Sequence, residues 1–328
     1  MLNKKSAQVG KNYTTGFLVV LVFILSVVLF INAEDYVTAM IAFNDTNITQ
    51  ATVVEQNIAP TVESIQMNSG ANIDLVGGGT KNTNCTAIIN DNNGRDDMKT
   101  DARGNVTFYS SETVNTCHAS PGDSAYRCYY NGTYNSVDLT SICINHNTTA
   151  VNCTFTTDLY YNSENTTWQC YMAISDAGGM SGTATSGTID VNDLTAININ
   201  STTMDFGSVS PGSVSGEAVM QVLNYGNIQL DLKLNGSDMV CDTGSKEAIV
   251  VGNISYNITG ASPVWGTTNL TNEISAAKDI NIFPNETVVD ADPTATYNNT
   301  WWRLYMPPSS QGARGSCSGT IWFIGTAG

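Results

Sequence analysis

Beyond residue 34, apolar and polar residues alternate in short stretches that are separated by turn-forming residues. In residues 228–234, four isoleucine or leucine side chains fall on one face, and Gln229, Asp231 and Lys233 fall on the other. This period of two is typical of a half-buried antiparallel strand. The same reasoning predicts strands over residues 36–43, 62–67, 85–89, 106–110, 125–130, 150–160, 168–175, 182–191, 198–206, 218–223, 249–256, 279–283, 299–306 and 320–325. No stretch after the N-terminal segment sustains a helical period, so an all-β chain is predicted.

Turn signals divide these strands at short intervals, as at residues 91–94, 176–179, 211–212 and 224–227. Short strands with a turn about every 8 to 12 residues are typical of β-sandwiches. A break near Asn192 separates two such groups. The predicted organisation is therefore two tandem Ig-like β-sandwich domains, residues 57–193 and 194–328, after an N-terminal signal or anchor (1–33) and a strand with a linker (34–56).

The N-terminal segment resembles an export signal. Three lysines precede a 15-residue apolar run, residues 17–31, which is interrupted by Ser26, and Ala33 offers a small residue for cleavage. The run is shorter than the roughly 20 residues that cross a bilayer comfortably. Two interpretations stay open: a signal peptide cleaved after Ala33, or an uncleaved signal anchor. Both place the rest of the chain outside the cell, at the cell surface or secreted.

Eight cysteines, all beyond residue 80, fit that oxidising location. Cys85 and Cys170 lie near opposite ends of the first domain, and Trp168 precedes the latter by two residues, so this pair is expected to join the two sheets. Closing so long a loop contributes about 4–5 kcal/mol in the chain-entropy model. Cys241 and Cys317 are the pair left in the second domain. The other four are expected to pair among themselves; Cys117 with Cys153 and Cys128 with Cys143 nests best, and the sequence leaves the other pairings open.

Charge and composition narrow the choice of partners. The net charge is −16 and the pI about 4.2, a field that repels phosphate backbones and excludes nucleic acid as a partner. Asparagine, threonine and serine form many Asn-x-Ser/Thr sequons, which predict exposed loops and, in a glycosylating host, glycans. The candidate glycosylation sites are Asn105, Asn131, Asn147, Asn165, Asn235, Asn253, Asn257, Asn269, Asn285 and Asn298.

Two groups of motifs resemble a known family. Residues 204–212 (MDFGSVSPG), 222–227 (VLNYGN) and 230–232 (LDL), with 300–307 and 318–323, look like the "DFGxVxPG…NxGNxxLD" pattern of Ig-like domains in archaeal surface proteins. Residues 59–62, 90–94 and 174–178 are similar to the "DxNG…W…D.AG" domains that often precede them. The resemblance covers about residues 57–328 and implies tandem Ig-like sandwiches in a secreted or cell-surface protein. Its motifs are turns and strand ends, which specify fold more than function. Cys317 departs from the pattern, so the Cys241–Cys317 bridge has no support from the family.

One turn carries a candidate metal site. Oxygen ligands follow one another at Asp91, Asn93, Asp96 and Asp97, and Gly94 permits the sharp bend of a calcium loop. The loop lacks the bidentate glutamate of an EF-hand, and Arg95 places a positive charge inside it. The alternative is an acidic hairpin turn without a metal. We expect no catalytic residues and no cofactor other than this calcium ion.

Aromatic residues leave a further choice open. They could form a surface on which glycans stack, or fill the core and rim of the sandwiches. The residues concerned are Tyr129, Tyr130, Tyr134, Tyr160, Tyr161, Trp301 and Trp302.

The sequence therefore predicts a non-enzymatic envelope protein, structural or adhesive, whose partners are other envelope proteins or itself. The strand over residues 36–43, once freed, could add to the open sheet of a neighbour and build a filament or surface layer. The alternative is a carbohydrate-binding surface module with surface glycans as partners. Contact with the membrane is expected only through an uncleaved N-terminal segment.

Overall fold

The computed structural model describes residues 39–42, 48–51, 53, 55–98, 102–111, 126–131, 137–244, 248–260, 263–264, 266–286, 293–308 and 313–328. These residues form antiparallel sheets and short 3-10 turns, with no α-helix among them, as the alternation predicted. In this part of the chain no helix is long and apolar enough to cross a membrane. The predicted export signal lies outside the described residues.

The first unit, which we define as residues 60–191, contains two sheets around one core. One sheet has the order β3-β4-β9-β8, formed by Thr61–Met67, Thr80–Asn90, Ala150–Tyr160 and Cys143–Asn145. The other has the order β11-β10-β5-β6, formed by Ser181–Thr185, Thr167–Ser175, Arg103–Ser110 and Cys128–Asn131, with β12 (Ile189–Asp190) and β7 (Val137–Asp138) at its sides. Alternate residues of β10 point inward, so that Trp168, Cys170, Met172 and Ile174 are all buried.

The second unit, residues 197–327, has a separate core. Its larger sheet has the order β13-β14-β19-β17, formed by Ile197–Ile199, Ala218–Asn224, Thr296–Leu304 and Ile254–Asn257. A second sheet has the order β18-β15-β21, formed by Lys278–Ile282, Leu230–Gly236 and Ile321–Ala327. The strands β16 (Val240–Gly244) and β20 (Ala313–Ser318) pair as a two-stranded extension.

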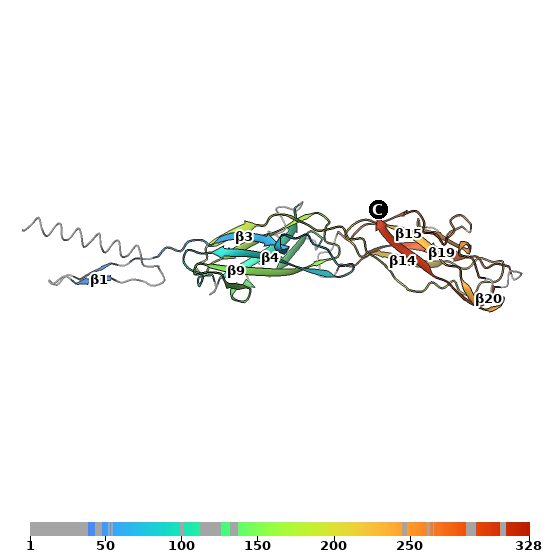
Figure 1. Ribbon diagram of the computed structural model, residues 1–328, viewed down its shortest axis with the longest axis horizontal. Coiled ribbons are helices and arrows are strands. Elements are labelled where there is room, and N and C mark those ends of the chain that lie inside the picture. Colours follow the sequence, from blue (N-terminus) through green and yellow to red (C-terminus); the bar gives the residue numbers. More distant parts are fainter. Residues whose placement is uncertain are drawn as a thin grey trace, which may run out of the picture.

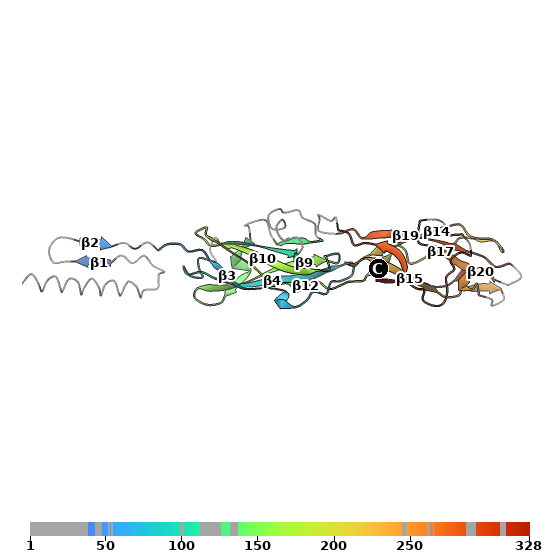
Figure 2. The same ribbon diagram turned by 90° about the horizontal axis from the view of Figure 1, so that it is seen from above.

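The two units lie end to end in an elongated molecule, and the C-terminus lies beside the junction between them (Figure 1). A separate hairpin, β1 (Ala39–Ala42) with β2 (Ile48–Ala51), extends beyond the far end of the first unit (Figure 2). Its pairing places Ala39 opposite Ala51. The hairpin is a sheet of its own and joins neither unit.

Some predicted strands are shorter than the alternation indicated. The strand expected over 198–206 ends at Ile199, because the Ser201 hydroxyl accepts the Thr203 amide and donates to the Thr203 carbonyl, which turns the chain away from β14. The strand expected over 182–191 is split into β11 and β12 at Ser186, whose hydroxyl bonds the backbone of Cys170 and Gly187. Local side-chain to backbone hydrogen bonds therefore ended these strands where the hydrophobic pattern continued.

The disulfides agree with the prediction in two places and differ in a third. Cys85 on β4 bonds Cys170 on β10 and so joins the two sheets of the first unit, and Cys241 bonds Cys317 across β16 and β20. The nested pairing is wrong, because Cys143 bonds Cys153. These two residues lie directly opposite each other on the neighbouring strands β8 and β9, which brings their side chains together. Cys128 is also disulfide-bonded, and Cys117 lies outside the described residues.

Candidate functional site

The turn after β4 holds a buried carboxylate. Asp91 Oδ1 accepts the Asn93 amide at 2.8 Å, and the Gly94 amide donates to the Asp91 carbonyl at 3.1 Å. Gly94 has φ of 109°, a region that L-residues rarely adopt, so the glycine is needed for this bend. Asp91 is the first residue of this turn, and its side chain is buried beneath the loop that follows, with 1% of the residue exposed.

Two further carboxylates reach the same place from different parts of the chain. Asp97 follows six residues later on the same loop, and Asp176 lies in the turn between β10 and β11, where its Oδ1 accepts the Met180 amide at 2.8 Å. The Ala177 amide donates to the Asp97 carbonyl at 3.1 Å, which ties the two loops together. One carboxylate oxygen from each of Asp91, Asp97 and Asp176 lies within 4.8 Å of the others. We call these three residues the acidic cluster.

The cluster is electrostatically unfavourable as it stands. Burial raises the pKa of Asp91 above its ordinary value, the hydrogen bond from Asn93 opposes this, and the charges of Asp97 and Asp176 add to the rise. Burial also raises the pKa of Asp97, with further contributions from Asp176 and from Glu55. A raised carboxylate pKa means that the ionised group destabilises the fold at neutral pH. A bound cation would remove that cost.

The structure brings together only some of the residues that the sequence predicted as calcium ligands. Asp91 and Asp97 lie in the acidic cluster, whereas Asp96 is exposed and pairs with Arg95 at 3.6 Å. Asn93 turns outward, since its Oδ1 accepts the Ile58 amide at 2.8 Å. Asp176, which is 85 residues from Asp91, was missed because only the fold brings their loops together. Its one sequence signal was a position in the second strong turn of the domain.

The predicted glycosylation sites differ in exposure. Asn105 is 3% exposed inside β5, so its side chain is closed to a glycan in the folded protein. Of the described remainder, Asn147, Asn165, Asn269 and Asn298 are exposed, and Asn235, Asn253, Asn257 and Asn285 are half-buried. The side chain of Asn131 is outside the described set.

Several of the aromatic residues pack in the cores. Tyr129 is buried against Trp168 and Tyr160, with ring centroids 5.9 and 6.0 Å away, and its hydroxyl bonds Ser163 at 2.7 Å. Burial raises its pKa. Trp302 is 0% exposed in the second core. Tyr134 and the side chain of Tyr130 are outside the described residues. The aromatics described here therefore support the core interpretation over a stacking surface.

The junction between the units is a feature that the sequence did not reveal. Asn227 is 1% exposed; its Nδ2 donates to the carbonyls of Ser163 and Asn192 at 3.0 and 3.1 Å, and its Oδ1 accepts the Leu194 amide at 2.6 Å. The sequence identified residues 224–227 only as a turn. In the fold, this turn of the second unit is inserted against the end of the first.

Two tyrosines extend the same contact. Tyr161, which is 3% exposed, donates its hydroxyl to the Pro293 carbonyl at 2.9 Å and packs edge-on against Tyr225 at 5.4 Å. The Gly78 amide also donates to the Tyr225 carbonyl at 3.1 Å. A Cβ at Gly226 would lie 2.0 Å from the Leu194 carbonyl oxygen, so only glycine fits at this point. The two units are thus joined by buried, directional contacts.

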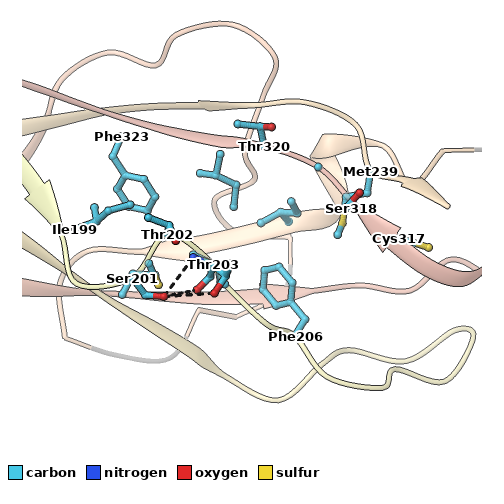
Figure 3. Close-up of a pocket in the computed structure, with 15 residues that line it drawn as sticks. Ile199, Ser201, Thr202, Thr203, Phe206, Met239, Cys317, Ser318, Thr320 and Phe323 are labelled. Atoms are coloured by element: carbon cyan, nitrogen blue, oxygen red, sulfur yellow. Dashed lines mark hydrogen bonds between the residues drawn. The ribbon is translucent and has the colours of Figure 1, made fainter. Parts of the chain in front are cut away.

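A crevice of about 330 Å³ opens into the second core between β21 and the segment that follows β13. Figure 3 shows Ile199 and Phe323 at one end and Met239 and Cys317 at the other, with Phe206 on the facing segment. Strand β21 pairs with β15 along one edge, and no described strand pairs with its other edge. The crevice therefore lies beside an unpaired sheet edge.

Comparisons with known proteins leave the family open. No family model and no curated protein matches the chain. Among solved structures, it is similar to the native α-2-macroglobulin of E. coli, with 9% identity and a TM-score of 0.27 over 85% of this chain. The chain spans 17% of the length of that protein.

Two streptococcal domains are also similar. The C-terminal domain of the Streptococcus agalactiae AgI/II polypeptide BspA matches 82% of this chain and 96% of its own length, at 9% identity and a TM-score of 0.20. The C-terminal domain of the Streptococcus pyogenes antigen I/II-family protein AspA matches 83% and 97%, at 9% identity and a TM-score of 0.21. Scores this low do not define a shared fold.

Proposed function

We propose that this chain is an extracellular, non-enzymatic surface protein in which two Ig-like sandwiches form a stiff rod. The strand order of the first unit supports the Ig-like assignment, because its sheets β3-β4-β9-β8 and β11-β10-β5 correspond to the A-B-E-D and G-F-C sheets of an Ig constant-type domain. The Cys85–Cys170 bridge then joins strands B and F, where antibody domains carry theirs.

The residue two positions before the second cysteine adds to this correspondence. In many Ig-like domains a tyrosine there bonds the backbone a few residues upstream. In this chain Trp168 has that position, and its Nε1 donates to the Glu164 carbonyl at 2.8 Å. The indole thus takes the place of the phenol at the start of the strand.

The observation that carries the proposed function is the junction. Buried hydrogen bonds from Asn227 and Tyr161 join units that lie end to end, which is an arrangement that sets a fixed distance between the two ends of a molecule. The disulfides support an oxidising, extracellular location. The two buried members of the acidic cluster, Asp91 and Asp176, are closed to a polymeric substrate and so favour a structural role over hydrolysis.

Small-angle X-ray scattering of the purified mature protein tests the rod. We expect a single elongated particle whose maximum dimension matches the two units in line, unchanged by salt. A distribution of bent conformers would contradict the proposal. The variant Asn227→Ala is expected to produce such a distribution, and Asn200→Ala is the control, because Asn200 is exposed and its side chain bonds Gln221 within the second unit.

The finer proposal is assembly by strand addition. The acceptor is the crevice beside the unpaired edge of β21, and the donor is the strand over residues 36–43 of a second copy, in which Val37, Ala39, Ile41 and Phe43 form one apolar face. The hairpin that contains β1 lies beyond the first unit, at the opposite end of the molecule from the second unit (Figures 1 and 2). All residues that line the crevice belong to the second unit. Insertion between copies is head to tail, and such a contact builds a filament when the rotation between copies does not close a ring.

Negative-stain microscopy of the mature protein, concentrated stepwise, tests assembly. We expect filaments for the natural chain and for Thr38→Asp, a position on the opposite face of the donor strand. We expect monomers for Ile41→Asp, which places a charge against the apolar side chains Met220, Ile254 and Phe323 of the crevice. Monomers of the natural chain at high concentration would remove strand addition but leave the rod intact.

A further inference from the structure

The acidic cluster has a feature that an ordinary acidic turn lacks. Asp91 is 1% exposed, and its Oδ2 has no hydrogen-bond partner among the described residues. A buried, ionised oxygen without a partner is costly, and such groups are normally paired or bound to a metal. Neither described salt bridge, Arg95–Asp96 or Arg127–Glu164, reaches the cluster. The carboxylate faces two others instead.

We propose that Asp91, Asp97 and Asp176 bind a calcium ion, and that this ion fastens the segment of residues 55–58 to the first unit. Hard oxygen donors are the ligands that Ca²⁺ takes, at about 2.3–2.6 Å, so oxygens on opposite sides of the ion are roughly 4.6–5.2 Å apart. The three carboxylate oxygens lie within 4.8 Å of one another and fit that sphere. Mg²⁺, with ligands at about 2.0–2.1 Å, requires the cluster to contract.

The segment that leads into the first unit already contacts this cluster. Asn57 Nδ2 donates to both carboxylate oxygens of Asp176, at 3.3 and 3.2 Å. The side chain of Asn93 accepts the Ile58 amide at 2.8 Å and donates to Glu55 Oε1 at 3.3 Å. Residues from two turns of the first unit, the turn after β4 and the turn after β10, therefore hold residues 55–58 against that unit.

Glu55 makes the attachment sensitive to the ion. Its charge acts on Asp97, so four carboxylates share one region, and without a cation Glu55 is repelled by the cluster. A bound Ca²⁺ lowers the summed charge of the three carboxylates from −3 to −1, so the repulsion of Glu55 becomes weaker. The ion thereby sets how firmly the segment is held.

A glycine provides space for this contact. The three atoms nearest to a Cβ at Gly178 would all belong to the Asn57 side chain, with Nδ2 at 2.0 Å. Gly178→Ala is therefore expected to displace the segment without removing a ligand. The variant separates the ion site from the attachment.

Calorimetric titration of the full, disulfide-bonded chain with CaCl₂, after treatment with EGTA, tests the ion site. We expect one site with a dissociation constant in the range of extracellular modules, about 10⁻⁴–10⁻³ M. Asp97→Asn is expected to weaken binding at least tenfold, and the adjacent Asp96→Asn, on an exposed side chain paired with Arg95, to leave it unchanged. Glu55→Gln, which lies outside the fold of the first unit, is expected to weaken binding two- to fivefold. Absence of binding, or equal effects of the two aspartate variants, would overturn the site.

Proteolysis with a glutamate-specific protease tests the attachment. We expect Ca²⁺ to slow cleavage after Glu55 at least tenfold in the natural chain and to have little effect in Gly178→Ala. Cleavage after Glu273, which is exposed in the second unit, is the internal reference. Circular dichroism shows whether each variant is folded. Calcium binding without protection of Glu55 would retain the ion site and overturn the attachment.

Discussion

The first and second units bury their cores to different degrees. Among the described residues, the first core has 23 buried members and 5 half-buried ones, and the second has 14 buried and 12 half-buried. Many half-buried residues of the second core lie at one place, because they line the crevice beside β21. A disulfide joins the two sheets of the first unit, whereas that of the second joins β16 and β20 at its end. The core of the first unit is thus closed, and the core of the second unit is open at the crevice beside β21.

Removal of each long-range disulfide is expected to have the largest effect. The bridges close loops of similar length, with sequence separations of 85 and 76, so the chain-entropy model assigns about 4–5 kcal/mol to each. The difference in unfolding free energy between the two double alanine variants therefore reports how well the core is packed around each disulfide. We expect Cys85→Ala with Cys170→Ala to cost roughly 1–2 kcal/mol more than Cys241→Ala with Cys317→Ala, because both cysteines of the first pair are 0% exposed.

Denaturant unfolding followed by tryptophan fluorescence measures both costs. The variant Cys143→Ala with Cys153→Ala is the reference, since its ten-residue separation predicts only about 2–3 kcal/mol. Equal costs for the two long-range bridges would show that the core of the second unit is as well packed at its disulfide as that of the first.

Truncation of one phenylalanine in each core tests the same contrast within the sheets. Phe155 is 1% exposed on β9, and Phe155→Ala is expected to cost about 3–5 kcal/mol. Phe323 lines the crevice, and Phe323→Ala is expected to cost about 1–2 kcal/mol, because part of its ring is already in contact with water.

If the strand over residues 36–43 fills the crevice, a synthetic peptide of that sequence should stabilise the natural chain and not Phe323→Ala.

Loss of the junction is expected to have an intermediate effect. Asn227→Ala leaves two carbonyls and one amide without partners at a buried site, which costs roughly 2–4 kcal/mol. Those partners belong to the first unit and to the connecting segment. We therefore expect the natural chain to unfold in one coupled transition in calorimetry, and the units of Asn227→Ala to unfold in separate transitions. An unchanged calorimetric profile would mean that the contacts do not couple the units.

The sequence predicted what local pattern determines. Alternation located β9 and β10 almost to the residue, and the Cys85–Cys170 bridge followed from spacing and from Trp168. The sequence could not predict that Asp176 lies close to Asp91, because their proximity depends on how two turns align at one end of a sandwich. The crevice was equally hidden, since the strand expected beyond Ile199 is ended by hydrogen bonds of Ser201 and not by a change in hydrophobicity.

A comparison of the two buried tryptophans gives the smallest expected difference. Trp168 in the closed unit donates to the Glu164 backbone carbonyl, and Trp302 in the open unit donates to the Thr300 hydroxyl, each at 2.8 Å. Both are 0% exposed, so tryptophan to phenylalanine removes the same volume in each core.

The hydrogen-bond partners respond alike, and the surroundings of the two side chains differ. After Trp168→Phe the Glu164 carbonyl still accepts the Thr166 amide at 3.0 Å, and after Trp302→Phe the Thr300 hydroxyl still donates to the Met220 carbonyl at 3.0 Å. Trp302 packs against Phe323, which lines the crevice, so the second core can relax around the lost volume more easily than the first. We therefore expect Trp168→Phe to cost about 1 kcal/mol more, measured as the free energy of unfolding of each unit. A larger cost for Trp302→Phe would mean that the second core tolerates a change of shape less well than the first, which is the opposite of what an open edge implies.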